Sequence, residues 1–234
     1  MGSNNIYWLK KRRKLERKSK LDREYKNSIL IVCEGEKTEP NYFKAFPVSG
    51  VKVEILGKGK NTKSLVNDAV AEWKKNAEEG KYFEKLWCVF DKDDFLQANY
   101  NQAFETVKSE EIRLNKKYKK KKGRKITIRI AYSNEAFELW YLLHYDYHTS
   151  GISRARYSGM LSHRMKRKYR KNDPDMYNFL LELSNKSSSC QGQEFAIQNA
   201  QKLRKVINGK QPYNHNPSTS VDLLVLELNN YLKK

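Results

Sequence analysis

The feature that most constrains the fold is a short, unbroken apolar run, Ser28–Cys33, which ends directly at Glu34. Its length and β-branched content favour a strand covered on both faces, because a strand with one wet face would alternate apolar and polar residues. Further strands are expected at residues 51–56, 86–90 and 126–131, with intervals long enough for helices. Strands that alternate with helices in this way predict a parallel sheet with right-handed crossovers.

Helical periodicity fills the intervals and dominates the C-terminal third. Apolar residues recur every three or four positions between Leu65 and Trp73, and Pro40 falls in the first turn of an earlier helix, where its missing N–H is tolerated. We therefore predict an α/β fold: a parallel sheet of about four strands flanked by helices, with a helical C-terminal portion. Further helices are expected at residues 134–145, 176–183, 195–207 and 220–232, without strands after residue 146.

The chain has 234 residues, which suits one α/β domain with an extension. We predict a basic N-terminal extension at residues 1–26, an α/β domain at 27–146, and a helical region at 147–234 packed on it. No segment approaches the roughly 20 apolar residues of a membrane span, and the N-terminus is charged where a signal peptide would be apolar. We expect a cytoplasmic protein whose three cysteines, Cys33, Cys88 and Cys190, are thiols and not disulfides or zinc ligands.

The charge is strongly basic and unevenly distributed. Lysine and arginine number 47 against 27 acidic residues, a balance of +20 that indicates a polyanionic partner, with nucleic acid the first candidate. Residues 10–26, 113–129 and 154–171 together carry more than half of these cations, and a lysine-rich loop is expected around residues 116–125. The alternative is that each run is a solvated helix face or loop. The residues chosen as nucleic-acid-binding candidates are Lys119, Lys120, Lys121, Lys122, Arg124, Lys166, Arg167 and Lys168.

Acidic residues follow two of the predicted strands, at the edge where active sites form in parallel sheets. If the two strands are neighbours, their carboxylates converge, which is unfavourable unless a cation lies between them. Oxygen ligands suit Mg²⁺ or Mn²⁺ better than zinc. The alternative is that the acids only cap helices. The first strand is followed by Glu34, Glu36 and Glu39, and the third by Asp91, Asp93 and Asp94.

Glu138 is a further candidate with two interpretations. It falls near the start of the helix after the fourth strand, close to the same edge of the sheet. As a catalytic residue it would join the acidic cluster; as a structural residue it would accept hydrogen bonds from backbone donors around Ser133 and Asn134. The sequence leaves both open. The phosphate-binding pattern GxxxxGK[ST] is absent, so ATP hydrolysis by this chain alone is not expected.

Four motifs resemble those of one known family. Residues 31–43, IVCEGEKTEPNYF, resemble the opening motif of RloB-like proteins, which are related to the Toprim domains of topoisomerases, primases and OLD-type nucleases. Residues 89–93, VFDKD, resemble the DxD strand end of the family. Residues 133–140, SNEAFELW, resemble its helix start, and residues 216–221, NPSTSV, its C-terminal motif. The resemblance covers most of residues 28–232.

The resemblance implies roles for individual residues. Glu34 matches the Toprim glutamate, Asp91 and Asp93 match the paired aspartates, and Glu39 matches an additional acid of OLD-like nucleases. Asp222 departs from the pattern, because a more basic or histidine-like residue is expected after the C-terminal motif. The family is associated with defence against phage, often beside an ATPase subunit, and that context is implied by the resemblance alone.

The leading functional hypothesis is a metal-dependent nuclease that cuts RNA or DNA phosphodiesters. Glu34, Asp91 and Asp93 would be catalytic, and Glu34, Glu39, Asp91 and Asp93 would bind Mg²⁺ or Mn²⁺, with Glu36, Asp94 and Glu138 as further candidates. The alternative is a non-catalytic sensor of nucleic acid or nucleotide that works with a partner ATPase. A primase or topoisomerase-like activity is less favoured, because the chain lacks a clear catalytic tyrosine domain or zinc module.

Overall fold

The computed structural model describes residues 27–58, 65–92, 97–122, 125–186, 191–206 and 212–233. Its centre is a five-stranded sheet with the strand order β2-β1-β3-β4-β5. Neighbouring strands from β2 to β4 are parallel, and β5 pairs antiparallel with β4. The expected parallel sheet of about four strands is therefore confirmed. The strands are β1 (Ser28–Cys33), β2 (Lys52–Gly57), β3 (Lys85–Asp91), β4 (Thr127–Asn134) and β5 (Ser218–Thr219).

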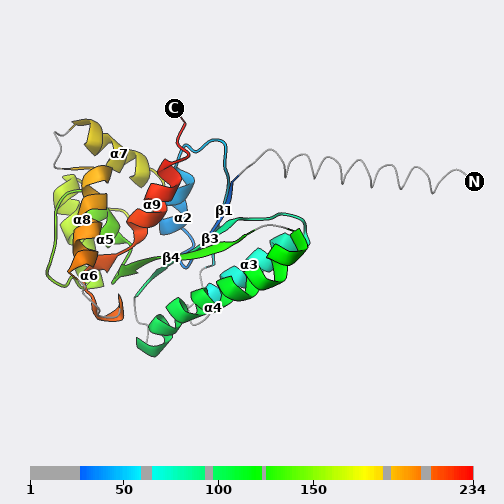
Figure 1. Cartoon of the computed structure of the whole chain (residues 1–234). Coiled ribbons are helices and arrows are strands. Elements are labelled where there is room, and N and C mark those ends of the chain that lie inside the picture. The colour runs from blue at the N-terminus through cyan, green and yellow to red at the C-terminus, as the bar shows by residue number, and fades with distance from the viewer. Residues whose placement is uncertain are drawn as a thin grey trace, which may run out of the picture.

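Helices cover both faces of the sheet (Figure 1). Two of them, α3 (Leu65–Glu78) and α4 (Gln97–Lys122), lie side by side on one face. The remaining helices gather on the other face and include the C-terminal helices that the sequence predicts. They are α2 (Thr38–Lys44), α5 (Glu138–Leu142), α6 (Arg154–Met165), α7 (Met176–Lys186), α8 (Gln193–Lys205) and α9 (Val221–Asn229), with a 3₁₀ turn, η2 (Pro212–Asn214), before β5.

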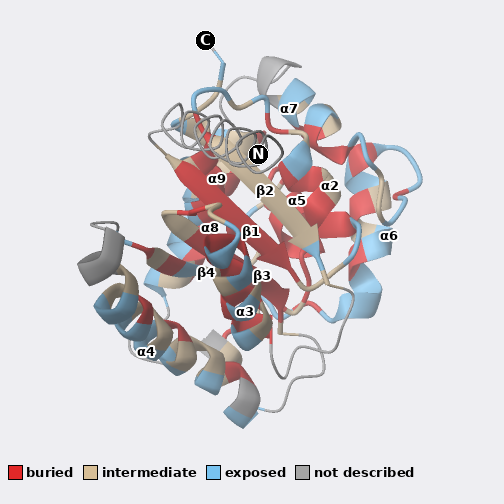
Figure 2. Cartoon of the chain, turned by 90° about the vertical axis from the view of Figure 1, so that its right-hand side faces the viewer, coloured by how far each residue is buried: buried red, intermediate tan, exposed pale blue. Residues whose placement is uncertain are grey.

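The strand β1 separates two hydrophobic cores. Ile29, Ile31 and Cys33 belong to the core beneath the C-terminal helices, whereas Leu30 and Val32 belong to the core beneath α3 and α4. All five side chains are inaccessible to solvent, and Figure 2 shows the buried centre of the sheet between exposed helix surfaces. Burying an aliphatic side chain of this size contributes about 1.5–3 kcal/mol. The unbroken apolar run is therefore a strand covered on both faces, as predicted.

The larger core joins the sheet to the C-terminal helices through aromatic rings. The ring of Tyr42 in α2 lies 5.7 Å from that of Phe137 and 5.5 Å from that of Tyr177 in α7. Leu161 of α6 and Leu224 of α9 are fully buried in the same core. The C-terminal helices are thus packed against the sheet by a continuous apolar contact, which fixes the loops between them over the sheet edge.

Three elements differ from the sequence prediction. The lysine-rich run expected as a loop forms the C-terminal part of α4, whose Tyr100, Val107 and Leu114 are buried at helical spacing. Lysine is a good helix former, and a buried stripe is enough to hold its exposed face in place. The predicted helix at 134–145 is shorter, because β4 continues to Asn134. The expectation of no strand after residue 146 is wrong at β5, whose two residues are too few to show a period.

Two smaller expectations concern cysteines and membranes. Cys33 and Cys88 are buried free thiols, as predicted, and Cys190 lies outside the described residues. In the part of the chain that the structure describes, no helix is both long enough and apolar enough to cross a membrane.

Candidate active site

The two strands with acidic ends are neighbours in the sheet. β1 and β3 run parallel, with Cys33 opposite Val89, so both strands end at the same edge. There the backbone N–H of Asp91 donates a hydrogen bond to a carboxylate oxygen of Glu34, at 3.3 Å. The sequence predicts that the carboxylates converge if these two strands are neighbours, and the strands are neighbours. The carboxyl edge of a parallel sheet is also where ligands bind in such folds.

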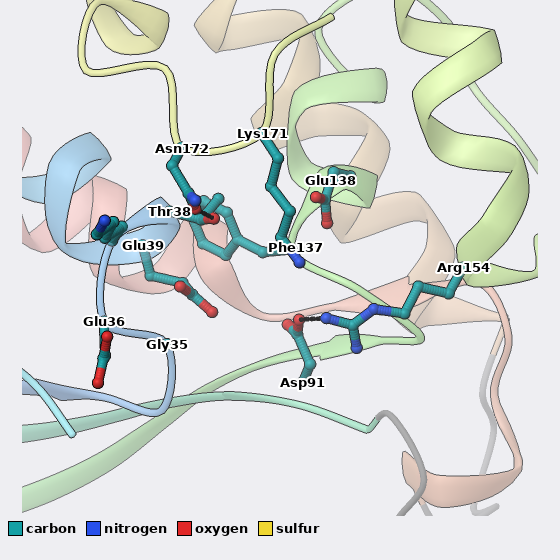
Figure 3. A pocket seen from close by; sticks show the side chains of 11 residues that line it. Gly35, Glu36, Thr38, Glu39, Asp91, Phe137, Glu138, Arg154, Lys171 and Asn172 are labelled. Carbon is teal, nitrogen blue, oxygen red and sulfur yellow. Dashed lines mark hydrogen bonds and ion pairs between the residues drawn. The ribbon is translucent and has the colours of Figure 1, made fainter. Parts of the chain in front are cut away.

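A pocket of about 360 Å³ opens at this edge (Figure 3). Its wall comes from the turn between β1 and α2, the end of β3, the start of α5, the start of α6 and the loop between α6 and α7. The pocket thus combines the sheet with parts of the C-terminal helical region. Its lining residues are Gly35, Glu36, Lys37, Thr38, Glu39, Asp91, Phe137, Glu138, Arg154, Lys171 and Asn172.

Three carboxylates lie almost buried in this pocket. Glu39, Asp91 and Glu138 are 5%, 6% and 8% exposed. The Tyr169 hydroxyl donates a hydrogen bond to Glu138, at 3.1 Å. Within the described part of the chain, Glu39 Oε2 and Asp91 Oδ1 have no hydrogen-bond partner. Buried carboxylate oxygens normally have partners, so these two atoms indicate a place for a ligand that supplies positive charge or a proton.

The electrostatics of the acids point the same way. Burial raises the pKa of Asp91 well above its ordinary range, and the charges of Glu39 and Glu138 raise it further, against the opposing charge of Arg154. Burial also raises the pKa of Glu39 from 4.5 to about 7, with added repulsion from Glu138 and Glu34, while a backbone hydrogen bond and Lys171 oppose the shift. The ionised pair is therefore unfavourable without a compensating cation.

The donor set fits a hard cation with oxygen ligands. Across the described ranges no cluster of three or more His, Cys, Asp or Glu side chains is arranged to hold a metal ion. Mg²⁺ does not require one, because it is usually bound through one or two carboxylates together with water and substrate phosphate. The unpartnered oxygens of Glu39 and Asp91 match that requirement. Asp93 and Asp94, the other predicted acids after β3, lie outside the described residues.

Gly35 is required for the position of Glu39. A Cβ atom at residue 35 would lie 2.2 Å from Glu39 Oε2, closer than any real contact. The absence of a side chain there leaves the room that the Glu39 carboxylate occupies. The sequence run Glu34-Gly35 predicts the turn after β1, but its steric relation to Glu39 is visible only in the folded chain.

The remaining acidic candidates have different surroundings. Glu36 lines the pocket but is exposed, and its side chain points away from the other carboxylates (Figure 3). The carboxylate of Glu138 lies in the pocket beside Tyr169, so the structure brings it together with Glu39 and Asp91. Whether any of these acids takes part in catalysis stays a prediction.

Three cationic residues line the pocket, Lys37, Arg154 and Lys171, and none was predicted as an individual site residue. Lys37 is exposed, whereas Arg154 and Lys171 act on the buried acids. Arg154 Nη2 lies 4.0 Å from Asp91 Oδ2, and the charge of Lys171 lowers the pKa of Glu39 against the effect of burial. In the sequence these residues are the first and last members of the third basic run, and nothing in a single sequence separates them from their neighbours. The run itself was the only signal.

The predicted nucleic-acid-binding residues fall on two surfaces. Lys166 and Lys168 are exposed after α6, whereas Arg167 pairs with Asp173 at 3.1 Å and lies over the Phe179 ring. Arg167 therefore also stabilises the loop between α6 and α7. Lys119, Lys120, Lys121 and Lys122 form the last turn of α4, although the description does not extend to their side chains, and Arg124 lies outside the described residues.

Asp222, which departs from the expected family pattern, has a structural partner. It is fully buried and forms a two-pronged ion pair with Arg204 of α8, with Nη2–Oδ2 at 2.7 Å. Arg204 also donates to the Thr219 carbonyl, so the pair joins α8, β5 and α9. The segment 216–221 thus attaches the C-terminal helices to the edge of the sheet.

Comparison with known proteins gives one positive result. No curated protein and no solved structure matches this chain. The family model described as RloB-like protein matches residues 29–228. That range includes the sheet except for the first residue of β1, every residue that lines the pocket, and the Arg204–Asp222 pair. Because the match covers most of the chain, this protein belongs to the RloB-like family.

Proposed function

We propose that this protein is a Mg²⁺- or Mn²⁺-dependent nuclease of the Toprim type, which cuts phosphodiesters of RNA or DNA in defence against phage. The observation that carries the proposal is the pair of buried carboxylates, Glu39 and Asp91, each with an unpartnered oxygen at the carboxyl edge of a parallel sheet. The defence context comes from the family resemblance.

The chain's own residues supply three functions to such a reaction. Glu39 and Asp91 would hold the cation, with Glu34 and Asp93 as further proposed ligands. When bound, the metal would polarise a phosphate oxygen and make an attacking water more acidic. Glu138, hydrogen-bonded to Tyr169, is a carboxylate that can accept a proton beside the cation site. Glu34 orients the end of β3 through its contact with the Asp91 backbone.

The basic surfaces would hold the substrate backbone. Lysines contact phosphate charge without reading bases, so they favour binding of many sequences. The end of α4 and the exposed Lys166 and Lys168 are suited to this role. An acidic pocket within a basic chain supports the proposal, because such a surface attracts the polyanion and the pocket concentrates the cation.

The test is cleavage by the purified protein. Labelled tRNA, single-stranded RNA and plasmid DNA are incubated in Mg²⁺ or Mn²⁺, and we expect products that disappear in EDTA and with Asp91→Asn. Glu78→Gln, which removes an exposed carboxylate of α3, is the matched control and should retain cleavage. Products of equal yield from the Asp91→Asn protein would show that cleavage does not depend on Asp91, and the assignment of the site would be wrong.

The alternative from the sequence is a sensor that binds nucleic acid or nucleotide and works with a partner ATPase. The same experiment separates the two. Retention of labelled RNA or DNA by the wild-type protein, with no cleavage in either metal, would favour the sensor. Addition of candidate ATPase subunits to the mixture would then test whether cleavage requires a partner.

A further inference from the structure

We propose that Arg154 and Lys171 form a phosphate-binding wall of the pocket, which holds a phosphate group of the substrate against the carboxylate floor formed by Glu39 and Asp91. This inference rests on the proposed function and deepens it by naming the residues that bind the substrate's reacting group. Neither residue belongs to the acidic motifs, and both come from the helical region after residue 146.

The guanidinium of Arg154 lines the pocket beside Asp91. Arg154 Nη2 and Asp91 Oδ2 are 4.0 Å apart, beyond hydrogen-bond distance, and the arginine side chain is 40% exposed. The guanidinium therefore lies beside the acid and is partly open to solvent. A guanidinium presents parallel N–H donors that match two oxygens of a phosphate, and such paired contacts are among the stronger hydrogen bonds.

A relay of hydrogen bonds fixes the backbone of Arg154. Its N–H donates to Glu135 Oε2 at 3.1 Å, and the Asn216 side-chain amide donates to Glu135 Oε1 at 3.2 Å. Asn216 Oδ1 in turn accepts the N–H of Ile152 at 3.1 Å. The start of α6 is thus attached both to the end of β4 and to the C-terminal motif. The backbone from which the Arg154 side chain extends is therefore held in place beside the pocket.

The loop that carries Lys171 is attached to α2, the helix of Glu39. Asn172 Oδ1 accepts the Thr38 hydroxyl at 2.5 Å, and the Asn172 carbonyl accepts the Asn41 amide at 3.1 Å. Asn172 has a φ of 67°, a left-handed conformation that asparagine tolerates better than most residues. In Figure 3 the Lys171 side chain extends from this loop toward the carboxylates.

The division of charge within the pocket explains why a phosphate would enter it. The floor attracts a cation, whereas a phosphate alone would be repelled by the same carboxylates. Two positive side chains on the opposite wall offset that repulsion and fix the side on which the anion binds. If they served only to neutralise the acids, their removal would leave Mg²⁺ affinity equal or higher and would lower phosphate affinity through charge alone, so that Arg154→Lys would recover the phosphate affinity in full.

The test measures inorganic phosphate binding to the full chain by isothermal titration calorimetry, once in Mg²⁺ and once in EDTA. Arg154→Gln and Lys171→Gln should each weaken phosphate binding by about tenfold or more, the loss of a charge-assisted hydrogen bond. The controls are Arg156→Gln in the same turn of α6 and Arg170→Gln beside Lys171, both exposed and outside the pocket lining. Arg154→Lys, which keeps the charge, should recover part of the affinity.

The outcomes separate this inference from the proposed function. The ratio between variant and control affinities reports on the cationic wall, whereas the change in affinity between Mg²⁺ and EDTA reports on the cation site. Equal affinities for Arg154→Gln and Arg156→Gln in both buffers, with folded proteins by circular dichroism, would overturn the inference. So would the absence of phosphate binding to the wild-type protein in both buffers. A loss of phosphate affinity in Arg154→Gln, together with no cleavage by the wild type or any variant, would support the phosphate-binding wall and contradict the proposed nuclease activity.

Discussion

At the scale of single residues, the site contains groups that weaken the fold when no ligand is present. Glu39 and Asp91 place negative charge in a nearly buried environment, and one oxygen of each has no partner within the described chain. A chain selected for stability alone would replace such groups by paired or apolar side chains. Proteins usually retain such destabilising groups only at functional sites.

Asp91→Asn should therefore leave the metal-free protein as stable as the wild type or more stable. The amide has nearly the same shape and removes the charge that burial, Glu39 and Glu138 disfavour. Mg²⁺ or Mn²⁺ should raise the melting temperature of the wild type through binding to the folded state, and the substitution should remove most of that rise. Differential scanning fluorimetry in EDTA and in each metal measures both effects.

Glu78→Gln is the control for the loss of one exposed carboxylate and should keep the full metal-dependent rise. A loss of about 1 kcal/mol in the metal-free Asp91→Asn protein, the size of a lost helix cap, would make Asp91 structural. The assignment of the metal site would then be wrong.

The protonation of Glu39 should make stability depend on pH in a specific window. Its pKa is raised from 4.5 to about 7, so the folded state holds this proton more tightly than the unfolded state. The free energy of unfolding should then fall as pH rises from about 4.5 to 7, by roughly 1.4 kcal/mol per unit of pKa difference. Urea titrations across this range in EDTA should show a flatter pH profile for Glu39→Gln than for the wild type.

Glu78→Gln is the control in these titrations, and its pH profile should follow that of the wild type. A difference between the Glu39→Gln and Glu78→Gln profiles therefore reports on Glu39 and not on the loss of any carboxylate. Saturating Mg²⁺ should also flatten the wild-type profile, since a bound cation favours the ionised carboxylate. Parallel profiles for wild type and Glu39→Gln in EDTA would contradict the assigned environment of Glu39.

Residues of the site differ in how far the sequence could predict them. The proximity of Glu34 and Asp91 followed from two apolar runs that end in acids, because parallel strands end at one edge. Arg154 and Lys171 could not be found in this way. Their place depends on how α6 and the loop after it lie over the sheet, and that geometry is set by contacts such as Asn172 with Thr38, 134 positions apart in the chain.

At the scale of elements, α4 has a lysine-rich C-terminal end, and the rest of the helix is packed on the sheet through buried side chains. Its middle part carries cations paired with acids of the same helix, Lys108 with Glu105 and Arg113 with Glu110. Its last turn is the run Lys119–Lys122, with no acid in the surrounding sequence. A run of cations with no acid near it in the sequence attracts phosphates more strongly than cations interleaved with acids.

Replacing Lys119–Lys122 by alanine should weaken binding of RNA and DNA of all sequences alike. Alanine favours the helix, so the fold should persist while backbone contacts are lost. Each lost phosphate contact should reduce the slope of log affinity against log salt by about 0.9 for duplex DNA. Fluorescence anisotropy at several salt concentrations measures the slope.

Lys108→Ala combined with Arg113→Ala is the control, and its slope should change less because those cations are already paired. An unchanged slope after removal of Lys119–Lys122 would place the nucleic acid elsewhere. Loss of binding for one sequence only would indicate base recognition by this helix.

The elements that the sequence predicted best were those with strong local signals. The buried strands β1 and β3 appear as apolar runs, β4 begins as an alternation of isoleucine with polar residues, and α3 appears as a regular apolar stripe. The helical state of the lysine-rich run was missed because charged residues mask a stripe whose buried members, Val107 and Leu114, are seven positions apart. The strand β5 has only two residues, and its pairing with β4 is fixed by hydrogen bonds such as Ser220 N–H to the Tyr132 carbonyl.

At the scale of the whole molecule, the site depends on parts of the chain that the sequence divides into an α/β domain and a helical region. Glu39 and Asp91 come from the first part, and Arg154 and Lys171 from the second. The two parts share one hydrophobic core that includes Ile31, Trp140 and Leu224. A site assembled in this way requires that the parts stay docked.

The shared core predicts that residues 27–233 unfold as one cooperative unit. Leu224→Ala removes a fully buried side chain from α9 and should lower the free energy of unfolding by about 2–5 kcal/mol. If the unit is cooperative, the loss must also appear at Trp73, which lies in the other core beneath α3 and α4. Tryptophan fluorescence reports on both cores, because Trp73 lies in one and Trp87 and Trp140 lie in the other. Urea unfolding followed by circular dichroism and by this fluorescence should give coincident single transitions, shifted together by Leu224→Ala. Val70→Ala in α3 is the matched change in the second core and should shift both signals in the same manner. Two separate transitions, with Leu224→Ala affecting only one, would show that the helical region is an independent domain, and the pocket would then form only when that domain docks.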